Sequence, residues 1–242
     1  MRVILCDNYE EMSAAATKLV ESQIILKPDC VLGLATGSTP VGMYKKLIEK
    51  YESGALDFSE VVTFNLDEYY PISRENNQSY YYFMNENLFK SINICKENIH
   101  IPNGETKDPD FECEEYERMI EEAGGIDLQI LGIGQNGHIG FNEPDENLNS
   151  KTHVTELTES TIKANSRFFD SIEEVPTKAL TMGIATILKS KKIILMACGK
   201  EKSDALAELL TDDIKTENPA TMLKVHPDVV LICDKDAYSK VK

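Results

Sequence analysis

A glycine-rich stretch past the middle of the chain carries residues that could perform acid–base chemistry. It reads GIGQNGHIGFNEP over residues 132–144 and holds His138 and Glu143 five residues apart. Histidine is the side chain that titrates closest to neutral pH, and a glutamate within reach can orient it. The same stretch also contains G-x-G-x-x-G after an apolar run, which is part of a dinucleotide-binding fingerprint. Two chemistries are therefore open: acid–base catalysis, or binding of a nucleotide.

Local composition counts against the nucleotide. A dinucleotide fingerprint opens a helix at its third glycine, normally in the first βαβ unit. Here the third glycine is followed by HIGFNEP, in which Gly140 and Pro144 disfavour a helix, and the stretch lies past mid-chain. We interpret these glycines as positions where the backbone comes close to a ligand. The alternative is a purely structural role, with His138 in the core and the glycines in a turn.

A second stretch, LATGSTPVGMY, has the composition of an anion-binding turn. Gly37, Ser38 and Thr39 form a small, hydroxyl-rich turn before Pro40, which suits a helix N-terminus. Backbone N–H groups, hydroxyls and a helix N-terminus together can bind one phosphate. A plain helix-capping turn would have the same composition, so both interpretations stay open.

A third stretch places acids directly after an apolar run. Asp67 and Glu68 follow the predicted strand 61–65 and precede Pro71. Pro71 blocks continuation of a helix, so we expect a loop that presents these side chains. A carboxylate there can act as a proton-transfer base if the site excludes water. The alternative is a pair of surface acids.

The elements that must position these residues alternate along the chain. The predicted strands are continuously apolar, as expected for strands covered on both faces, and amphipathic segments separate them. We therefore predict one α/β domain over residues 1–242, a doubly wound, mostly parallel, Rossmann-like sheet with helices on both faces. In such a sheet ligands bind at the carboxyl ends of strands, where the three stretches fall. The predicted strands are 2–6, 30–35, 61–65, 126–133, 192–198 and 228–233, and the predicted helices are 10–24, 40–51, 79–89, 111–124 and 202–210.

Bulk properties exclude several classes of function. The 242 residues carry a net charge of −16, which argues against a nucleic-acid partner because phosphate backbones need a basic face. No apolar run approaches the roughly 20 residues of a membrane span, and the N-terminus lacks a signal-peptide core, so we expect a cytoplasmic protein without a membrane partner. The six cysteines form no C-x-x-C pair and the four histidines show no metal-ligand spacing, so we expect neither disulfides nor a metal.

Taken together, the three stretches resemble the glucosamine-6-phosphate deaminase family of sugar-phosphate isomerases, nearly end to end. The motifs that carry the resemblance are GLATGSTPVGMY, FNLDEYYPI, NQSYYYFMNENLF, GIGQNGHIGFNEP, ANSRFF, ALTMGIATIL, GKEKSDAL and PATMLKVHPDVVLICD. The combination of NLDEY with NGHIGFNEP is highly specific. The related 6-phosphogluconolactonases share the phosphate turn and a G-x-G-x-D-G-H loop, but not the FNEP that follows here.

The resemblance implies a reaction without a cofactor, in which glucosamine 6-phosphate and water give fructose 6-phosphate and ammonia. It implies that Asp67 moves the proton between C2 and C1, that His138 assists ring opening, and that Glu143 orients and charges the histidine. It also implies that the 37–39 turn holds the phosphate together with two cations, Arg167 and Lys202. Such local cations also make sense in a chain of charge −16, which must hold a dianion.

One catalytic position departs from the family pattern. Many members have aspartate two residues before the histidine, and this chain has Asn136. An amide can accept a hydrogen bond from a backbone or imidazole N–H, but it adds no negative charge. Glu143 is then the carboxylate expected to support a charged imidazole.

The resemblance also bears on regulation. Hexameric members are activated by N-acetylglucosamine 6-phosphate at an inter-subunit site built from a serine and basic residues after FNEP and a tyrosine in a longer C-terminal tail. Here Glu146 aligns with the serine, His153 and Thr155 align with the basic residues, and the sequence stops at Lys242. A dianion is repelled by acids at close range. We expect a non-allosteric monomer or small homo-oligomer.

Two other functions remain open from the sequence. One is a non-catalytic sugar-phosphate sensor, since the fold also serves as an effector-binding domain, although no helix-turn-helix or basic region is present. The other is a related enzyme, a galactosamine-6-phosphate deaminase or a 6-phosphogluconolactonase.

Overall fold

All six predicted strands lie in one seven-stranded parallel sheet. The computed structural model describes residues 1–158, 162, 171 and 174–241. The strand order is β1-β10-β9-β6-β2-β3-β5, and every pairing in this sheet is parallel. The chain moves from β2 outward to β3 and β5, and β6 then returns to the other side of β2, which makes a switch point between β2 and β6. The strands are β1 (Arg2–Cys6), β2 (Val31–Leu34), β3 (Val62–Asn65), β5 (Ile99–His100), β6 (Leu128–Gly132), β9 (Ile193–Ala197) and β10 (Val229–Asp234).

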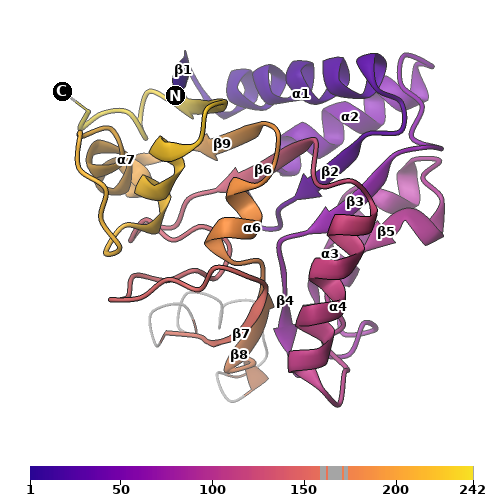
Figure 1. Cartoon of the computed structure of the whole chain (residues 1–242). Coiled ribbons are helices and arrows are strands. Elements are labelled where there is room, and N and C mark those ends of the chain that lie inside the picture. The colour runs from indigo at the N-terminus through magenta and orange to yellow at the C-terminus, as the bar shows by residue number, and fades with distance from the viewer. Residues whose placement is uncertain (159–161, 163–170, 172–173, 242) are drawn as a thin grey trace.

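Helices cover both faces of this sheet, which confirms the doubly wound prediction. Helices α1 and α2 pack on one face with α3, and α4, α6 and α7 bury their apolar side chains on the other (Figure 1). Side chains alternate across each strand, so neighbouring strand residues feed two separate cores. The helices are α1 (Tyr9–Leu26), α2 (Val41–Glu52), α3 (Tyr80–Asn87), α4 (Pro109–Glu122), α6 (Ile184–Leu188) and α7 (Ser203–Leu209).

Local capping residues set where several of these helices begin. Asn8 accepts from the backbone N–H of Glu11 at 3.0 Å and starts α1. Ser79 accepts from the N–H of Tyr82 at 3.0 Å and starts α3. Each cap satisfies one of the N–H groups that a helix N-terminus leaves without an intrahelical partner.

Two local predictions are wrong. Strand β1 was expected to be covered on both faces, but it is an edge strand, and Val3 and Leu5 are 38% and 49% exposed. The segment after β3 was expected to be a loop, but Asp67–Tyr70 forms strand β4. It pairs antiparallel with β8 (Lys178–Thr181), which pairs with β7 (His153–Glu156) in a second, three-stranded sheet below the first (Figure 1). Pro71 therefore ends a strand, because the antiparallel partner supplied by distant sequence supersedes the local loop signal.

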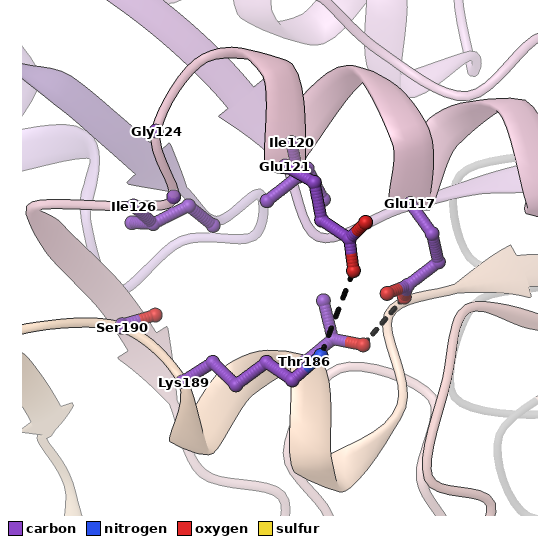
Figure 2. Close-up of a pocket in the computed structure, with 9 residues that line it drawn as sticks. Glu117, Ile120, Glu121, Gly124, Ile126, Thr186, Lys189 and Ser190 are labelled. Carbon is purple, nitrogen blue, oxygen red and sulfur yellow. Dashed lines mark hydrogen bonds and ion pairs between the residues drawn. The ribbon is translucent and has the colours of Figure 1, made fainter.

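A buried carboxylate fixes this second sheet to α4. Glu117 is 8% exposed, and one of its oxygens accepts from the backbone N–H and the hydroxyl of Thr152, both at 2.7 Å, and from the hydroxyl of Thr186. Thr152 directly precedes β7, so α4, α6 and β7 are held together at one point. Figure 2 shows Glu117 next to Thr186 in the lining of a pocket of about 310 Å³, which also includes the ion pair of Glu121 and Lys189. None of the predicted site residues lines this pocket.

Three further features concern cysteines, metals and membranes. All six cysteines are free; Cys6, Cys30, Cys113 and Cys233 are buried, Cys198 is half-buried and Cys95 is exposed. In the described ranges no group of three or more histidine, cysteine or acidic side chains is arranged to hold a metal ion. The described helices include none that is long and apolar enough to cross a membrane.

Candidate active site

The three sequence stretches meet at one edge of the large sheet. The strands β9, β6, β2 and β3 are neighbours, and all four are parallel, so their carboxyl ends lie side by side. The 36–39 turn follows β2, Asp67 comes two residues after β3, and the glycine-rich loop follows β6. Lys202 comes five residues after β9. The prediction that the chemistry gathers at this edge is therefore supported by the topology.

Asp67 is a buried carboxylate without a counter-charge in the described part of the chain. It opens β4, lies opposite Thr181 in the strand pairing and is 6% exposed. The described residues donate no hydrogen bond to its carboxylate. Burial, and then the negative charge of Glu68, raise the pKa of Asp67 from 3.8 to about 8. Both causes disfavour the charged form, which makes the ionised carboxylate a strong base.

The glycine-rich loop presents His138 beside Glu143. The imidazole Nδ1 lies 3.3 Å from Glu143 Oε2, which is an ion-pair distance, although Nδ1 makes no aligned hydrogen bond. The Asn136 side chain donates from Nδ2 to the same Glu143 oxygen at 2.6 Å, and its Oδ1 accepts from the backbone N–H of His138 at 3.3 Å. Asn136 therefore bridges the two residues by hydrogen bonds and adds no charge of its own.

Two glycines of this loop make room for the site. At Gly134 a Cβ atom would lie 2.4 Å from the ring of His138, so only glycine lets the imidazole pack against this backbone. Gly140 has φ +59°, and a Cβ there would lie 2.9 Å from the hydroxyl of Thr181 and 3.6 Å from Asp67 Oδ2. The loop thus passes directly over the Asp67 carboxylate. Residues 133–158 contain no helix, so the fingerprint does not open one, in agreement with the argument against a dinucleotide.

The candidate phosphate turn and Lys202 both interact with Cys198. The hydroxyl of Thr39 hydrogen-bonds to the thiol of Cys198, whose pKa is raised mainly by burial and lowered in part by this bond and by Lys202. Gly37 has φ +88°, and Gly37 and Ser38 are exposed. The hydroxyl of Tyr9 donates to the backbone oxygen of Ser38 at 2.9 Å and supports the turn from α1. These contacts bring the turn and one predicted cation to the same place.

The second predicted cation, Arg167, lies outside the described residues.

Tyr80 is a site residue that the sequence interpretation missed. Its hydroxyl hydrogen-bonds with Tyr69 of β4 and with Thr36 of the phosphate turn. Its ring stacks on Phe141 of the glycine-rich loop at 6.0 Å and 6°, and packs against Tyr69 at 4.8 Å. One side chain from α3 therefore contacts all three stretches. The run SYYYF carried no chemical signal by itself, because three tyrosines after a helix cap are equally compatible with plain packing.

The fold and this edge define the class of protein: a doubly wound α/β protein with a buried carboxylate, a histidine–carboxylate pair and a hydroxyl-containing turn at the carboxyl ends of its strands. The chain belongs to the family of glucosamine-6-phosphate isomerases and 6-phosphogluconolactonases, whose model matches residues 7–231.

Individual relatives are close over their whole length. A glucosamine-6-phosphate deaminase of Clostridium botulinum (strain Langeland) is 60% identical over 242 residues, which cover 100% of this chain and 99% of that protein. One from Thermoanaerobacter pseudethanolicus is 60% identical over 241 residues, covering 100% and 95%. Among solved structures, a monomeric glucosamine-6-phosphate deaminase has a TM-score of 0.97 at 46% identity, covering 99% of this chain and 100% of that one. A 6-phosphogluconolactonase from Trypanosoma cruzi, with a TM-score of 0.81, 19% identity and coverage of 100% and 97%, shares the fold alone.

Proposed function

We propose that this chain is a glucosamine-6-phosphate deaminase, which converts glucosamine 6-phosphate and water to fructose 6-phosphate and ammonia. The observation that carries the proposal is the buried Asp67 carboxylate directly beneath the loop that presents His138 and Glu143. The full-length identity of 60% to deaminases supports the choice of substrate.

Ring opening is the first step. Opening the pyranose moves a proton from the hydroxyl on C1 to the ring oxygen, and His138 can carry it at neutral pH. Its Nδ1 faces Glu143, so Nε2 is the nitrogen that remains for the sugar. Glu143 orients the ring from 3.3 Å, and the Asn136 side chain donates a hydrogen bond to Glu143.

Proton transfer and loss of the amine follow. Asp67 removes the proton from C2 while the C1 carbonyl oxygen gains the proton that the ammonium on C2 gives up, which leaves an enolamine across C1 and C2. The same carboxyl then returns its proton to C1. The amine on C2 becomes an iminium group, water adds to it, and ammonia leaves as the ketone forms. A base whose pKa is about 8 can do both, because it accepts the C2 proton readily and is still acidic enough to return it.

The phosphate is assigned to the turn of Gly37, Ser38 and Thr39. Its N–H groups, its hydroxyls and the ammonium of Lys202 together suit a dianion, and Arg167 is the second proposed cation. The proposal requires local cations here because the chain as a whole is strongly acidic.

The assembly and regulation of the protein belong to the same proposal. We assign it as a single-domain, cytoplasmic, non-allosteric monomer, and the 46% identical deaminase described as monomeric supports this assignment. Asp145 and Glu146 are exposed where the hexameric enzymes need donors for their effector. Hyperbolic kinetics, unchanged by N-acetylglucosamine 6-phosphate, are expected.

An ammonia-release assay tests the function and the substrate together. Glucosamine 6-phosphate should give ammonia and fructose 6-phosphate in equal amounts, galactosamine 6-phosphate should react far more slowly, and 6-phosphogluconolactone should hydrolyse no faster than without enzyme. Glucosamine without its phosphate should be a very poor substrate, because charge-assisted contacts contribute roughly 1.5–3 kcal/mol each. Preference for the galacto epimer or for the lactone would reassign the enzyme, and no turnover of any of them would favour a sensor.

A further inference from the structure

Glu68 is a buried carboxylate next to the proposed base, and neither the mechanism nor the phosphate site uses it. It is 1% exposed. Successive residues of a strand point to opposite faces, so while Asp67 faces the glycine-rich loop, Glu68 faces away from it, toward α3. It therefore acts on the reaction only through another residue.

Three backbone N–H groups hold the Glu68 carboxylate. Its Oε1 accepts from Tyr69 at 2.9 Å and from Tyr80 at 2.8 Å, and its Oε2 accepts from Tyr81 at 2.9 Å. Tyr80 and Tyr81 are the first two residues of α3, where free N–H groups and the helix dipole favour an anion. The carboxylate thus clamps β4 onto the N-terminus of the helix that also supplies the Tyr80 ring.

Among the described residues, Glu68 is the main source of negative charge near Asp67. Tyr80 from α3 and Tyr116 from α4 also face Asp67, but the pKa of each phenol is raised by burial, so both are neutral at working pH. Thr181 of β8 is uncharged, and the loop above Asp67, which also carries His138 and Glu143, contacts it through Gly140.

The two carboxyl groups titrate in a defined order. Burial raises the pKa of Glu68 to about 7, while its three N–H donors and Arg74 lower it in part. The described residues donate no such bond to Asp67, so the N–H groups at Glu68 favour the state in which Glu68 is ionised and Asp67 is protonated. The next proton must then leave Asp67 against a charge that is already present.

We propose that Glu68 is a positioning residue for the reaction: its buried charge makes Asp67 a stronger base, and its clamp on α3 fixes the strand that carries Asp67. This inference rests on the proposed deaminase function. Two hypotheses must be distinguished. In one, the charge of Glu68 strengthens Asp67 as a base; in the other, the Glu68 carboxylate only caps α3.

A matched pair of variants tests it. Glu68→Gln keeps the size and an acceptor oxygen for the clamp but removes the charge, and Glu68→Asp keeps the charge but shortens the clamp. For Glu68→Gln we expect the acid limb of the kcat/KM pH profile to move down by about one pH unit, and kcat on the plateau to fall about 3- to 10-fold, because a weaker base drives proton transfer less well. For Glu68→Asp we expect the acid limb to stay in place while the melting temperature falls.

A readout independent of turnover keeps the inference distinct from the proposed function. Side-chain carboxyl carbons labelled with ¹³C can be titrated by NMR, with the Asp67 signal assigned by its loss in Asp67→Asn. In Glu68→Gln this signal should titrate at lower pH than in the wild type, and in Glu68→Asp it should not. An unmoved signal and acid limb in Glu68→Gln, or equal shifts in both variants, would overturn the inference. If Glu68→Gln does not fold, a downward shift in the folded Glu68→Asp variant would overturn it as well. Failure of the wild type to release ammonia would instead refute the deaminase function, whatever the titration shows.

Discussion

Two buried aspartates lie at opposite edges of the large sheet, one just before a strand and one two residues after a strand, and they differ in the groups that contact their carboxylates. Asp127 lies just before β6, at the amino end, and is 4% exposed. Its carboxylate accepts from Lys27 and Lys191, both at 2.7 Å, and from the backbone N–H of Val31 at 2.8 Å. Asp67, at the carboxyl end, is buried almost equally but has neither a cation nor a donor among the described residues.

The difference changes the sign of the electrostatic effect. Burial alone would raise the pKa of Asp127, but the hydrogen bonds from Lys191, Lys27 and Val31 outweigh it, and the net pKa is lowered. For Asp67 burial and the charge of Glu68 act together and raise the pKa. The ionised carboxylate of Asp127 therefore stabilises the fold. The ionised carboxylate of Asp67 destabilises the fold and binds a proton readily.

The largest expected effect is a loss of turnover in a variant that still folds. Asp67→Asn should lower kcat by a factor on the order of 100 or more, because an amide cannot accept the C2 proton, while KM changes little. Asp127→Asn is the matched control: the same chemical change at the other end of the sheet should leave kcat near that of the wild type. Ammonia-release kinetics measure both. Near-normal turnover of Asp67→Asn would remove Asp67 from its role.

A second substitution probes the opposite wall of the site. If His138 opens the ring, His138→Gln should lose about 10- to 100-fold in kcat/KM on the closed sugar, the range typical of a proton-transfer group, and much less on an open-chain analogue. Parallel assays on the two substrates give the ratio. Equal losses would assign His138 to structure or to a later step, and Asp67 would then be the only acid–base group tied to a defined step.

The comparison between the two aspartates also predicts how stability depends on pH. Asp67 has a folded pKa near 8 and an ordinary value of 3.8, so the folded state binds more protons and wild-type stability should fall as pH rises between these values. Asp67→Asn removes this loss. It should be more stable than the wild type by on the order of a few kcal/mol at pH 9, and should differ little near pH 4.

Asp127 should behave in the opposite way. Its lowered pKa contributes stability above the ordinary value of 3.8, and this contribution is lost as pH falls through the folded value. Asp127→Asn should therefore cost about 1–3 kcal/mol at pH 7, the usual cost of losing charged hydrogen bonds, and progressively less in acid. Urea denaturation of both variants at several pH values measures these effects. The same pH trend in both variants would show that the two sites do not differ as described.

The sequence predicted the large sheet better than the second, three-stranded sheet. Continuous apolar runs located six of the seven strands of the large sheet, and acids, glycines and hydroxyls directly after three of those runs located the edge with the candidate site. The strand β5 was missed because it has two residues, and the second sheet was missed because its strands, DEYY, HVTE and KALT, are not continuously apolar and pair with distant segments. Pro71 favoured a loop for residues 67–70, because the antiparallel partner of that segment lies far away in the sequence.

Roles that depend on partners were beyond the sequence. Asp67 and Asp127 are the same residue type beside buried strands, and only the folded chain shows that lysines 100 and 64 residues away reach one of them. Tyr80 likewise joins the three site segments by contacts that its neighbours in the sequence do not reveal. The roles of all the predicted site residues remain predictions, although the structure brings the described ones to the expected edge.

The smallest expected effect concerns Asn136, the position that departs from the family. Its side chain now donates to Glu143 and accepts from the backbone of His138, so it links the pair without adding charge. Asn136→Asp keeps the acceptor, removes the donor and adds a carboxylate near the imidazole. The added charge should favour the protonated histidine and move the pH optimum upward by a few tenths of a unit, while repulsion from Glu143 offsets part of the gain. Turnover at the optimum should therefore stay within about threefold of the wild type, since the two terms oppose each other.

Asn136→Ala, which removes both bonds, should lose more activity and leave the optimum unmoved. The pH profiles of the two variants decide the point: a loss of more than tenfold in Asn136→Asp would show that the neutral amide link to Glu143, rather than the charge near His138, is what this chain requires at the position.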